Sequence, residues 1–498
     1  MHLHSFPRLI VALAVAVGVA ASGALTNPFA LKRQMRPHPE PRTNVLFLIA
    51  DDLNCDLGCY GAAGMRTPHL DRLAARGVRF ERAYCQIPLC SPSRTSLLTG
   101  RRPDATGVTE NPAADNPYAA HFRMHLRDVV TLPQLFKQDG WFAARVGKIY
   151  HYGVPYDIGT AGLDDLASWD LTVNPRGRDR ELHDTIYAPG PERTHRTLGA
   201  PDSGFTWFAD PEGSDGEHTD GIGATEAIEL LERFKREERP FFLAVGFYRP
   251  HTPYVAPAHY FDLYPAEAIE LPGLSAEDRK RHPRAAYATW RKDQEDATEA
   301  QRRGAIQAYR ASISFVDAQV GRVVDALDRL GLAENTVIVF TSDHGYHLGD
   351  HGLWHKMSLF ERSARVPLII AAPGAKAAGR TSRSLVELLD LYPTLADLAG
   401  IPAASRLDGV SLRPILDDTS ATVKTAAFSQ IRERAGRSAG YAVRTERWRY
   451  IEWDSGSQGA QLYDLESDPD ETTNLAGEAR HAGEVQALRA LLEQYRAR

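Results

Sequence analysis

The chain alternates between short, continuously apolar runs and longer segments with helical periodicity. The apolar runs cover residues 44–50, 241–247, 336–341 and 366–371. Runs of this length are typical of strands that are buried on both faces of a sheet. Between them, apolar side chains recur every three or four positions in residues 225–238 and 305–330, which predicts amphipathic helices. We therefore expect an α/β fold in which helices cover both faces of a mostly parallel sheet.

The pattern changes from about residue 402. Short segments at 441–444, 448–453 and 461–464 alternate apolar with polar positions or carry aromatic residues between turn-forming residues, and 484–496 has the period of a helix. These features predict a smaller antiparallel C-terminal subdomain over residues 402–498 that ends in a helix.

Two long segments have no clear periodicity. Residues 153–220 are polar and rich in glycine, proline and aspartate, and residues 104–130 form a second long loop. Because long loops often line substrate sites, we expect recognition of the substrate to depend on them.

The N-terminus has the features of a secretory signal. A weakly cationic start is followed by the uncharged apolar run 9–21 and by small residues at 22–24. A membrane anchor is the alternative, but this run is shorter than the roughly 20 residues that a bilayer span requires. We expect residues 1–24 to be a signal peptide and 25–42 a linker. The protein is then exported, to the periplasm or the extracellular space, without a stable membrane span.

Composition narrows the classes of partner. The chain has 58 Lys+Arg against 64 Asp+Glu, a formal net charge of −6. It therefore lacks the basic field that non-specific binding to nucleic acid needs, and any bound anion must be held by a local cluster. The four cysteines are too close together in the sequence to staple distant parts of the fold; they are Cys55, Cys59, Cys85 and Cys90. Pairing among the first three stays open.

Cys90 lies at a predicted helix terminus. Ser91 followed by Pro92 favours an N-cap and a first turn, and Gly100 favours the end of a short helix. The N–H groups and the dipole at such a terminus favour an anion and stabilise a thiolate. From these residues alone, Cys90 is either a nucleophile or the partner of Cys85 in a disulfide.

Acidic residues follow two of the predicted strands. Asp51 and Asp52 end the first apolar run, and Asp343 and His344 follow the third. Because the carboxyl ends of parallel strands meet at one edge of a sheet, we expect these four side chains to converge. Three carboxylates with a neighbouring donor suit Ca²⁺ or Mg²⁺ better than zinc.

The segment around Cys90 resembles a known family signature. Cys-Ser-Pro-Ser-Arg at 90–94, followed by Thr-Gly-Arg-Arg at 99–102, is similar to the signature of the type I sulfatases, in which the cysteine is oxidised to Cα-formylglycine. The resemblance runs from residue 44 to the Leu-Tyr-Asp-Leu-Glu segment that begins at 462. It is strongest toward the iduronate-2-sulfatase branch, through the segments 51–61, 147–151, 249–251 and 341–356. Tyr152 stands where that branch usually has proline, and we expect this departure to alter the wall of the substrate pocket.

The resemblance implies a fold and an activity. The fold is an alkaline-phosphatase-like sheet, with the catalytic domain over residues 43–401. The activity is hydrolysis of a sulfuric ester, with release of inorganic sulfate from a sulfated sugar or glycan. A formylglycine-generating or sulfatase-maturating enzyme becomes a partner. One Ca²⁺ per chain is implied, with ligands from the two strand ends and the modified cysteine: Asp51, Asp52, Cys90, Asp343 and His344.

The same resemblance assigns roles to a set of catalytic residues: Cys90, Arg94, Lys148, His151, His251 and Lys356. Arg94 polarises the nucleophilic hydroxyl, Lys148 and Lys356 hold the sulfate oxygens, and His251 or Lys356 protonates the leaving alcohol. His151 takes the proton from the second hydroxyl of the hydrated aldehyde. Three further histidines are not expected to be catalytic: His347, His351 and His355.

Two other functions remain under consideration. One is a phosphomonoesterase or phosphodiesterase of the alkaline phosphatase superfamily, against which the full Cys-x-Pro-Ser-Arg pattern argues. The other is a carbohydrate-binding protein without activity on the same fold, against which the presence of every catalytic position argues.

Overall fold

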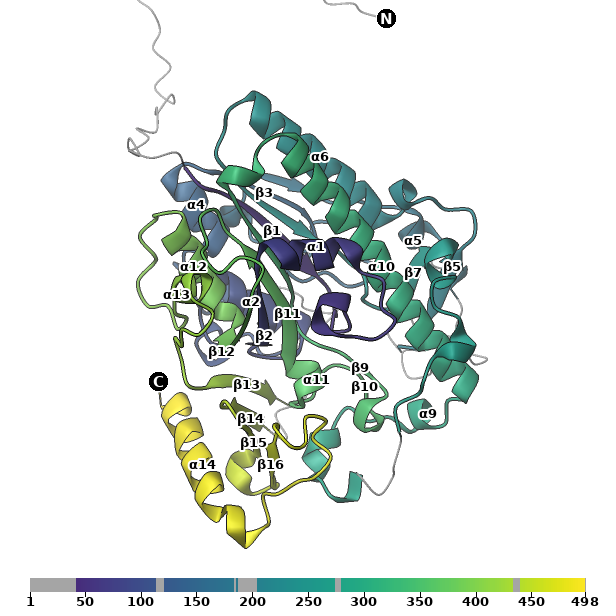
Figure 1. Cartoon of the computed structure of the whole chain (residues 1–498), viewed down its shortest axis with the longest axis vertical. Coiled ribbons are helices and arrows are strands. Elements are labelled where there is room, and N and C mark those ends of the chain that lie inside the picture. Colours follow the sequence, from purple (N-terminus) through teal and green to yellow (C-terminus); the bar gives the residue numbers. More distant parts are fainter. Residues whose placement is uncertain are drawn as a thin grey trace, which may run out of the picture. The chain divides into compact units, whose positions relative to one another are not determined.

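The structure is a computed structural model that describes residues 42–112, 121–182, 185–186, 204–273, 279–432 and 439–497 (Figure 1). The predicted signal peptide lies outside these residues, as does all of the predicted linker except Arg42. Within the described part of the chain, no helix has both the length and the apolar character to cross a membrane.

An eight-stranded sheet forms the centre of the fold, in the order β12-β2-β11-β8-β1-β6-β3-β4. Seven strands run in one direction, and β11 runs antiparallel to both of its neighbours. The strands are β1 (Asn44–Ala50), β2 (Val78–Tyr84), β3 (Phe142–Gly147), β4 (Leu171–Val173), β6 (Phe241–Gly246), β8 (Thr336–Ser342), β11 (Arg365–Ala371) and β12 (Thr381–Glu387). The predicted mostly parallel α/β sheet is confirmed. Apolar runs do not encode strand direction, so the reversal of β11 was not foreseen.

Helices cover both faces of this sheet because the side chains of each strand alternate between them. Leu46 and Leu48 of β1 pack into one core with α1 (Pro68–Arg76), α6 (Thr219–Arg236) and α10 (Glu299–Arg329). Val45 and Phe47 of the same strand pack into a second core on the other face, with α2 (Cys90–Thr99), α4 (Leu132–Asp139), α12 (Leu391–Leu398) and α13 (Arg413–Asp417). The two predicted amphipathic helices are α6 and α10.

The start of α2 differs from the prediction. Cys90 is the first residue of the helix, and Leu89, not Ser91, is the N-cap. The Ser91 N–H donates instead to Asn111 Oδ1 at 2.9 Å, so a side chain from a distant loop satisfies the helix terminus. Gly100 ends the helix as predicted, in the left-handed conformation with φ 64°.

The C-terminal part forms a four-stranded antiparallel sheet, as predicted, with one additional strand at its edge. Its strands are β13 (Ala427–Arg432), β14 (Ala439–Arg444), β15 (Trp448–Trp453) and β16 (Ala460–Asp464), and α14 (Ala482–Arg496) packs on one face. The other face of this sheet packs against side chains from the preceding part of the chain, among them Leu353, Leu359 and Phe360.

The two long segments contain only short elements where they are described. Within these two segments, or at their ends, lie α3 (Pro103–Thr106), α5 (Arg178–Glu181) and β5 (Trp207–Asp210). The short elements in other parts of the chain are β7 (Tyr254–Pro257), α7 (Ala258–Phe261), α9 (Lys292–Glu295), β9 (His347–Leu348), β10 (Trp354–His355) and α11 (Glu361–Ala364). Strand β5 pairs with β7 apart from the main sheet, whereas β4 extends the main sheet at its edge.

Candidate active site

The ends of two adjacent parallel strands bring the predicted acidic residues together. Asp51 and Asp52 follow β1, and Asp343 follows β8, whose last residue is paired in register with the last residue of β1. Asp52 has a left-handed backbone with φ 64°, which is unfavourable for aspartate. It is held there because its N–H donates to Asp343 Oδ1 at 3.1 Å and its carbonyl accepts from Tyr309 Oη at 2.7 Å. Strain maintained in this way is common at functional sites.

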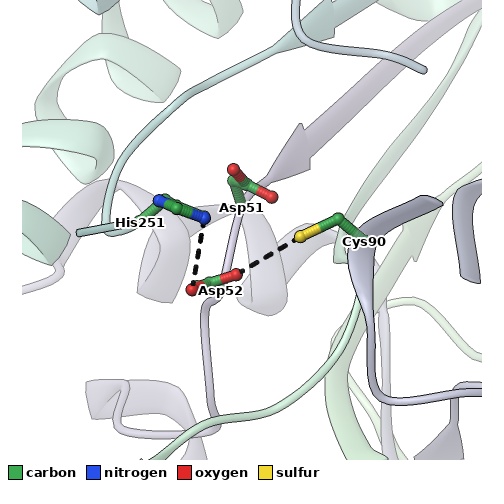
Figure 2. A group of neighbouring side chains, drawn as sticks. All are labelled: Asp51, Asp52, Cys90 and His251. Carbon is green, nitrogen blue, oxygen red and sulfur yellow. Dashed lines mark hydrogen bonds and ion pairs between the residues drawn. The ribbon is translucent and has the colours of Figure 1, made fainter. Parts of the chain in front are cut away.

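Two overlapping groups of potential ligands share Cys90. The ligand atoms of Asp51, Asp52, Cys90 and His251 all lie within 4.8 Å of one another, and so do those of Cys90, Asp343 and His344. Figure 2 shows Asp52 between Cys90 and His251, with 3.8 Å from Asp52 Oδ1 to Cys90 Sγ and 3.8 Å from Asp52 Oδ2 to His251 Nε2. The structure thus brings all five predicted metal ligands to one place, and His251 lies beside three of them, Asp51, Asp52 and Cys90.

The donor set fits a hard divalent cation. Asp52 Oδ2 is a buried acceptor without a hydrogen bond, and burial raises the pKa of Asp52 to about 7 although Lys356 opposes the rise. His344 Nδ1 lies 2.9 Å from the carbonyl oxygen of Gly345, to which it can only donate. Its Nε2 faces Asp52 Oδ1 at 3.2 Å, and although burial opposes the shift, the charges of Asp343 and Asp52 raise the pKa of His344 to about 9. A cation bound at this point would take the place of the proton on Nε2. Carboxylate oxygens dominate this set, and they are the ligands that Ca²⁺ and Mg²⁺ prefer.

Arg94 holds the carboxylates in place. From the second turn of α2, its Nη2 donates to Asp51 Oδ1 at 3.1 Å and its Nε donates to Asp343 Oδ2 at 2.8 Å. Its Nη1 donates to the carbonyl oxygens of Lys148 and Ile149 at 2.6 and 3.1 Å. The guanidinium is buried, and its hydrogen bonds go to these carboxylates and carbonyls, so the geometry makes Arg94 a positioning residue for the carboxylates.

Two lysines face the same cluster. Lys148 Nζ donates to Asp51 Oδ2 at 2.5 Å, and Lys356 Nζ donates to Asp52 Oδ1 at 2.5 Å and lies 3.4 Å from Cys90 Sγ. Burial raises the pKa of the Cys90 thiol, but the charges of Lys356 and Lys148 outweigh it, so that the net shift is downward. Both neighbours of Lys356 in the chain have positive φ, 74° at His355 and 66° at Met357. The backbone that presents this lysine is therefore held in a strained conformation.

The two predicted catalytic histidines lie beside these charges. Burial lowers the pKa of His251 well below its usual value, and Lys356 adds to the effect. Burial and Lys148 lower the pKa of His151 to about 3, and His151 Nδ1 is buried without a hydrogen-bond partner. Both imidazoles are neutral in this arrangement.

The histidines that were not expected to be catalytic lie in other surroundings. His347 is buried and its Nε2 contacts Ser358 Oγ at 2.7 Å, while His351 stacks on Phe360 with ring centroids 4.0 Å apart. His355 faces Tyr346 Oη through Nδ1 at 3.4 Å and lines a pocket beside the cluster.

The structure answers the open question about the cysteines and changes one expectation. All four cysteines are unpaired in the structure, so the Cys85–Cys90 disulfide is not formed and Cys55 and Cys59 are not bridged. Tyr152 is fully buried and packs with Tyr248, Val154 and Ile158. It therefore belongs to a small apolar core and not to the wall of a pocket, which corrects the prediction for this position.

Several residues that support the site had no predicted role. Asp220, in the first turn of α6, accepts the N–H groups of Tyr248 and Arg249 at 2.8 and 2.9 Å. Arg249 Nη1 donates to the carbonyl oxygen of His251 at 2.8 Å, and its Nη2 donates to Asp179 Oδ2 at 2.7 Å. These contacts fix the loop that carries His251. The Arg-Pro-His motif at 249–251 marked this loop as part of the predicted site. The residues that hold the loop, Asp220 and Asp179, are distant from it in the sequence and were not predicted.

A pocket of about 310 Å³ opens beside the cluster, and His251 and Lys356 form part of its wall. Its other lining residues are Asn111, Thr252, Thr289, Arg291, Gln294, Trp354, His355 and Met357.

The fold and the cluster together define an alkaline-phosphatase-like α/β hydrolase with a candidate metal site at the carboxyl edge of its sheet. The sulfatase family profile matches residues 43–401, and a second profile, N-sulphoglucosamine sulphohydrolase, C-terminal, matches residues 349–498. The chain belongs to the sulfatase family and is an enzyme of that family.

Individual relatives agree with this assignment. Mouse iduronate 2-sulfatase is 33% identical over 540 residues, which cover 90% of this chain and 93% of that protein. Among solved structures, the phosphonate monoester hydrolase of Agrobacterium radiobacter has a TM-score of 0.73 and 27% identity, with 92% of this chain and 96% of that one covered. A 2-O GAG sulfatase has a TM-score of 0.68 and 25% identity, with 91% and 92% covered. The predicted similarity to the iduronate-2-sulfatase branch is confirmed.

Proposed function

We propose that the enzyme hydrolyses a sulfuric ester of a sugar or glycan and releases inorganic sulfate, and that Cys90 is oxidised to formylglycine. The observation that carries the proposal is the position of Cys90, which is buried at the first residue of α2 with Sγ 3.4 Å from both Lys356 Nζ and His344 Nε2. The names of relatives support a sulfated glycan as substrate, since they include an iduronate 2-sulfatase and a 2-O GAG sulfatase.

Two groups complete the chemistry. A divalent cation, for which we propose Ca²⁺, would be held by Asp51, Asp52, Asp343, His344 and residue 90, and supplies charge neutralisation and a lowered pKa for a bound hydroxyl. Formylglycine in its hydrated form supplies two hydroxyls, one to attack sulfur and one to allow release of the product.

The chain's own residues bind the ester and move protons. Lys148 and Lys356 hold the sulfate oxygens in this proposal, which is supported by the position of both ammonium groups beside the carboxylates that surround residue 90. Lys356, or His251 after its Nε2 has taken up a proton, donates a proton to the leaving alcohol, and His151 accepts one from the second hydroxyl. Arg94 donates hydrogen bonds to both Asp51 and Asp343 and so holds the two carboxylates in fixed positions.

The first test concerns the modification. Trypsin releases the peptide 83–94, which contains Cys85 as well as Cys90. Alkylation of active protein should label this peptide once and not twice, because an aldehyde at position 90 has no thiol. Cys90→Ala should fold and lose sulfate release, whereas Cys85→Ala, its matched control, should retain it. Two alkylated cysteines in fully active enzyme would refute the formylglycine assignment.

The likeness to a phosphonate monoester hydrolase favours one second candidate, hydrolysis of phosphorus esters. A sulfate monoester carries one negative charge, whereas a phosphate monoester carries about two near neutral pH. With a divalent cation bound, Arg94, Lys148 and Lys356 against three carboxylates leave a modest positive excess that suits the monoanion. We expect kcat/KM for an aryl sulfate to exceed that for an aryl phosphate with the same leaving group. The opposite order, in protein shown to carry formylglycine, would favour the second candidate.

Export and maturation are part of the same proposal. The apolar run at 9–21 supports a signal peptide, and hence a periplasmic or extracellular enzyme. The sulfatase signature at 90–94 supports a formylglycine-generating or sulfatase-maturating enzyme as a partner. Cell fractionation and sequencing of the mature N-terminus test the first point.

A further inference from the structure

Three buried tyrosines pack together next to the candidate metal site, and we call them the tyrosine cluster: Tyr254, Tyr309 and Tyr346. Each is 0% exposed. The ring of Tyr309 stacks on that of Tyr346 with centroids 5.2 Å apart, and it lies nearly perpendicular to that of Tyr254 at 5.7 Å. The hydroxyls of Tyr254 and Tyr346 share a hydrogen bond of 2.8 Å. The three side chains therefore form one packed unit.

The tyrosine cluster joins parts of the chain that carry residues of the site. Tyr346 comes two residues after His344, in the loop that follows β8, and Tyr254 comes three residues after His251. Tyr309 comes from α10, on which no site residue was predicted. Packing of these rings against one another therefore fixes both loops relative to a helix that covers the sheet.

The hydroxyl of Tyr309 also clamps the turn that carries Asp52. It donates to the carbonyl oxygen of Asp52 at 2.7 Å and accepts the N–H of Asn54 at 2.9 Å, so that it bonds the backbone on both sides of Leu53. Burial raises the pKa of this phenol, which therefore remains a donor. Asn54 Nδ2 donates in turn to the carbonyl oxygen of Tyr346 at 3.1 Å, which ties the turn to the second ligand loop.

This clamp bears on the conformation of a predicted metal ligand. The backbone of Asp52 has φ 64°, which for an aspartate persists only when its surroundings hold it. Tyr309 bonds the carbonyl of this residue, and Asp343 bonds its N–H. A change in this backbone would move Asp52 Oδ1, which lies 3.2 Å from His344 Nε2 and 3.8 Å from Cys90 Sγ. The place of the carboxylate among the other ligands therefore depends on Tyr309.

We propose that Tyr309 is a positioning residue for the candidate metal site, which it serves through the turn of Asp52 and not by contact with the cation. The inference rests on the metal site of the proposed function. Groups that hold metal ligands in place in this way are part of the site energetically, and their loss typically lowers metal affinity about 10- to 100-fold.

Calorimetric titration of the metal-depleted full chain with Ca²⁺ tests the inference. Tyr309→Phe keeps the ring and its packing, but leaves the Asp52 carbonyl and the Asn54 N–H without their partner. We expect the affinity for Ca²⁺ to fall about 10- to 100-fold, and saturating Ca²⁺ to restore sulfate release by mass action.

A second variant carries the test if Tyr309→Phe does not fold. Asn54→Ala removes the side-chain bond to the Tyr346 carbonyl and leaves the Tyr309 clamp in place. It should lower the affinity for Ca²⁺ by a smaller factor, and an unchanged affinity in this variant would then count against the inference.

Tyr264→Phe is the matched control. The hydroxyl of Tyr264 also joins a loop to α10, because it accepts the Arg66 N–H at 2.9 Å and lies 2.6 Å from Ser314 Oγ. This variant should lower the melting temperature about as much as Tyr309→Phe and leave the affinity for Ca²⁺ unchanged. An unchanged affinity in folded Tyr309→Phe, or an equal fall in Tyr264→Phe, would overturn the inference.

The outcomes separate this inference from the proposed function. If Tyr309→Phe weakens Ca²⁺ binding in a protein that cleaves no sulfate ester, the proposed function fails and the inference stands. If the wild-type protein releases sulfate and binds Ca²⁺ no more tightly than Tyr309→Phe, the inference fails and the function stands. A wild-type protein that binds no Ca²⁺ would overturn the metal site and the inference together.

Discussion

Single side chains at the sheet edge balance one another's charge. Lys148 and Arg94 hold the pKa of Asp51 well below its usual value against the effect of burial. Asp52 differs, because its Oδ2 has no hydrogen bond and its pKa is raised to about 7. A buried carboxylate left in this state is costly. A cation bound beside Asp52 would remove that cost.

Replacement of Asp343 tests the candidate metal site at this scale. Asp343→Asn removes one negative ligand and weakens the ion pair with Arg94 Nε. We expect weaker Ca²⁺ binding by calorimetry and at least a tenfold loss of activity, which excess Ca²⁺ partly restores by mass action.

The matched control for this substitution is Asp397→Asn, since Asp397 is a half-exposed aspartate that pairs with Arg413 away from the site. It should change neither quantity. Full activity of the wild-type protein after exhaustive chelation, with no metal detected, would contradict the metal site.

Among the elements, the N-terminus of α6 has the clearest influence on the site. Asp220 accepts two N–H groups of the loop that leads to His251, although it contacts none of the reacting groups. Loops that follow the carboxyl ends of strands carry the chemistry of α/β folds, and their precision depends on contacts of this kind.

We expect Asp220→Ala to leave two buried N–H groups without an acceptor, at a cost of about 1–3 kcal/mol each in the free energy of unfolding. His251 should shift, so that kcat falls about tenfold or more while the metal content stays unchanged. Asp220→Asn retains one acceptor oxygen and should restore part of kcat. Glu229→Gln, on the exposed side of the same helix, is the control. Loss of metal in parallel with kcat would contradict a positioning role.

The strand ends could be predicted from the sequence, whereas the loop contacts could not. Asp51 and Asp343 follow continuous apolar runs, and a parallel sheet brings such ends together whatever the rest of the chain does. Asp220 and Asn111 act on backbone groups that lie at least 20 residues away, and no local pattern records such a pairing. Tyr152 was misjudged for the same reason, because its neighbour Tyr248 comes from another strand end.

At the scale of the whole molecule, a buried ionic cluster joins the C-terminal sheet to the segment that follows Lys356. Arg449 of β15 pairs with Glu361 of α11 and with Glu471, whose Oε1 lies 3.0 Å from Arg449 Nε. Glu471 also accepts the Glu361 N–H at 2.6 Å. Burial raises the pKa of Glu471 to about 8, and the charge of Glu361 adds to the rise although Arg449 opposes it.

This cluster predicts a pH dependence of stability. The pKa of Glu471 in the folded protein, about 8, lies above its ordinary value of 4.5, so the folded state binds the proton more tightly. The resulting stabilisation is complete below about pH 4.5 and is lost as the pH rises through 8. Between pH 6 and 9, we expect the free energy of unfolding to fall by about 1–3 kcal/mol in urea titrations.

Glu471→Gln should abolish this fall, because the amide does not titrate, and Glu466→Gln, at an exposed position of the same subdomain, should not. An identical pH profile for the wild-type protein and Glu471→Gln would contradict the role of Glu471.

The burial of Cys90 also has a practical meaning for anyone who produces this enzyme. Its side chain is 0% exposed, so a maturating enzyme cannot reach it once α2 has docked on the sheet. If Cys90 is the residue that is modified, the modification must take place on the nascent or unfolded chain. A host that lacks the maturating enzyme would then yield a well-folded product with ordinary melting behaviour and no turnover, and later addition of that enzyme would not rescue it. The specific activity of a preparation would report how its chains were synthesised, not how well they folded.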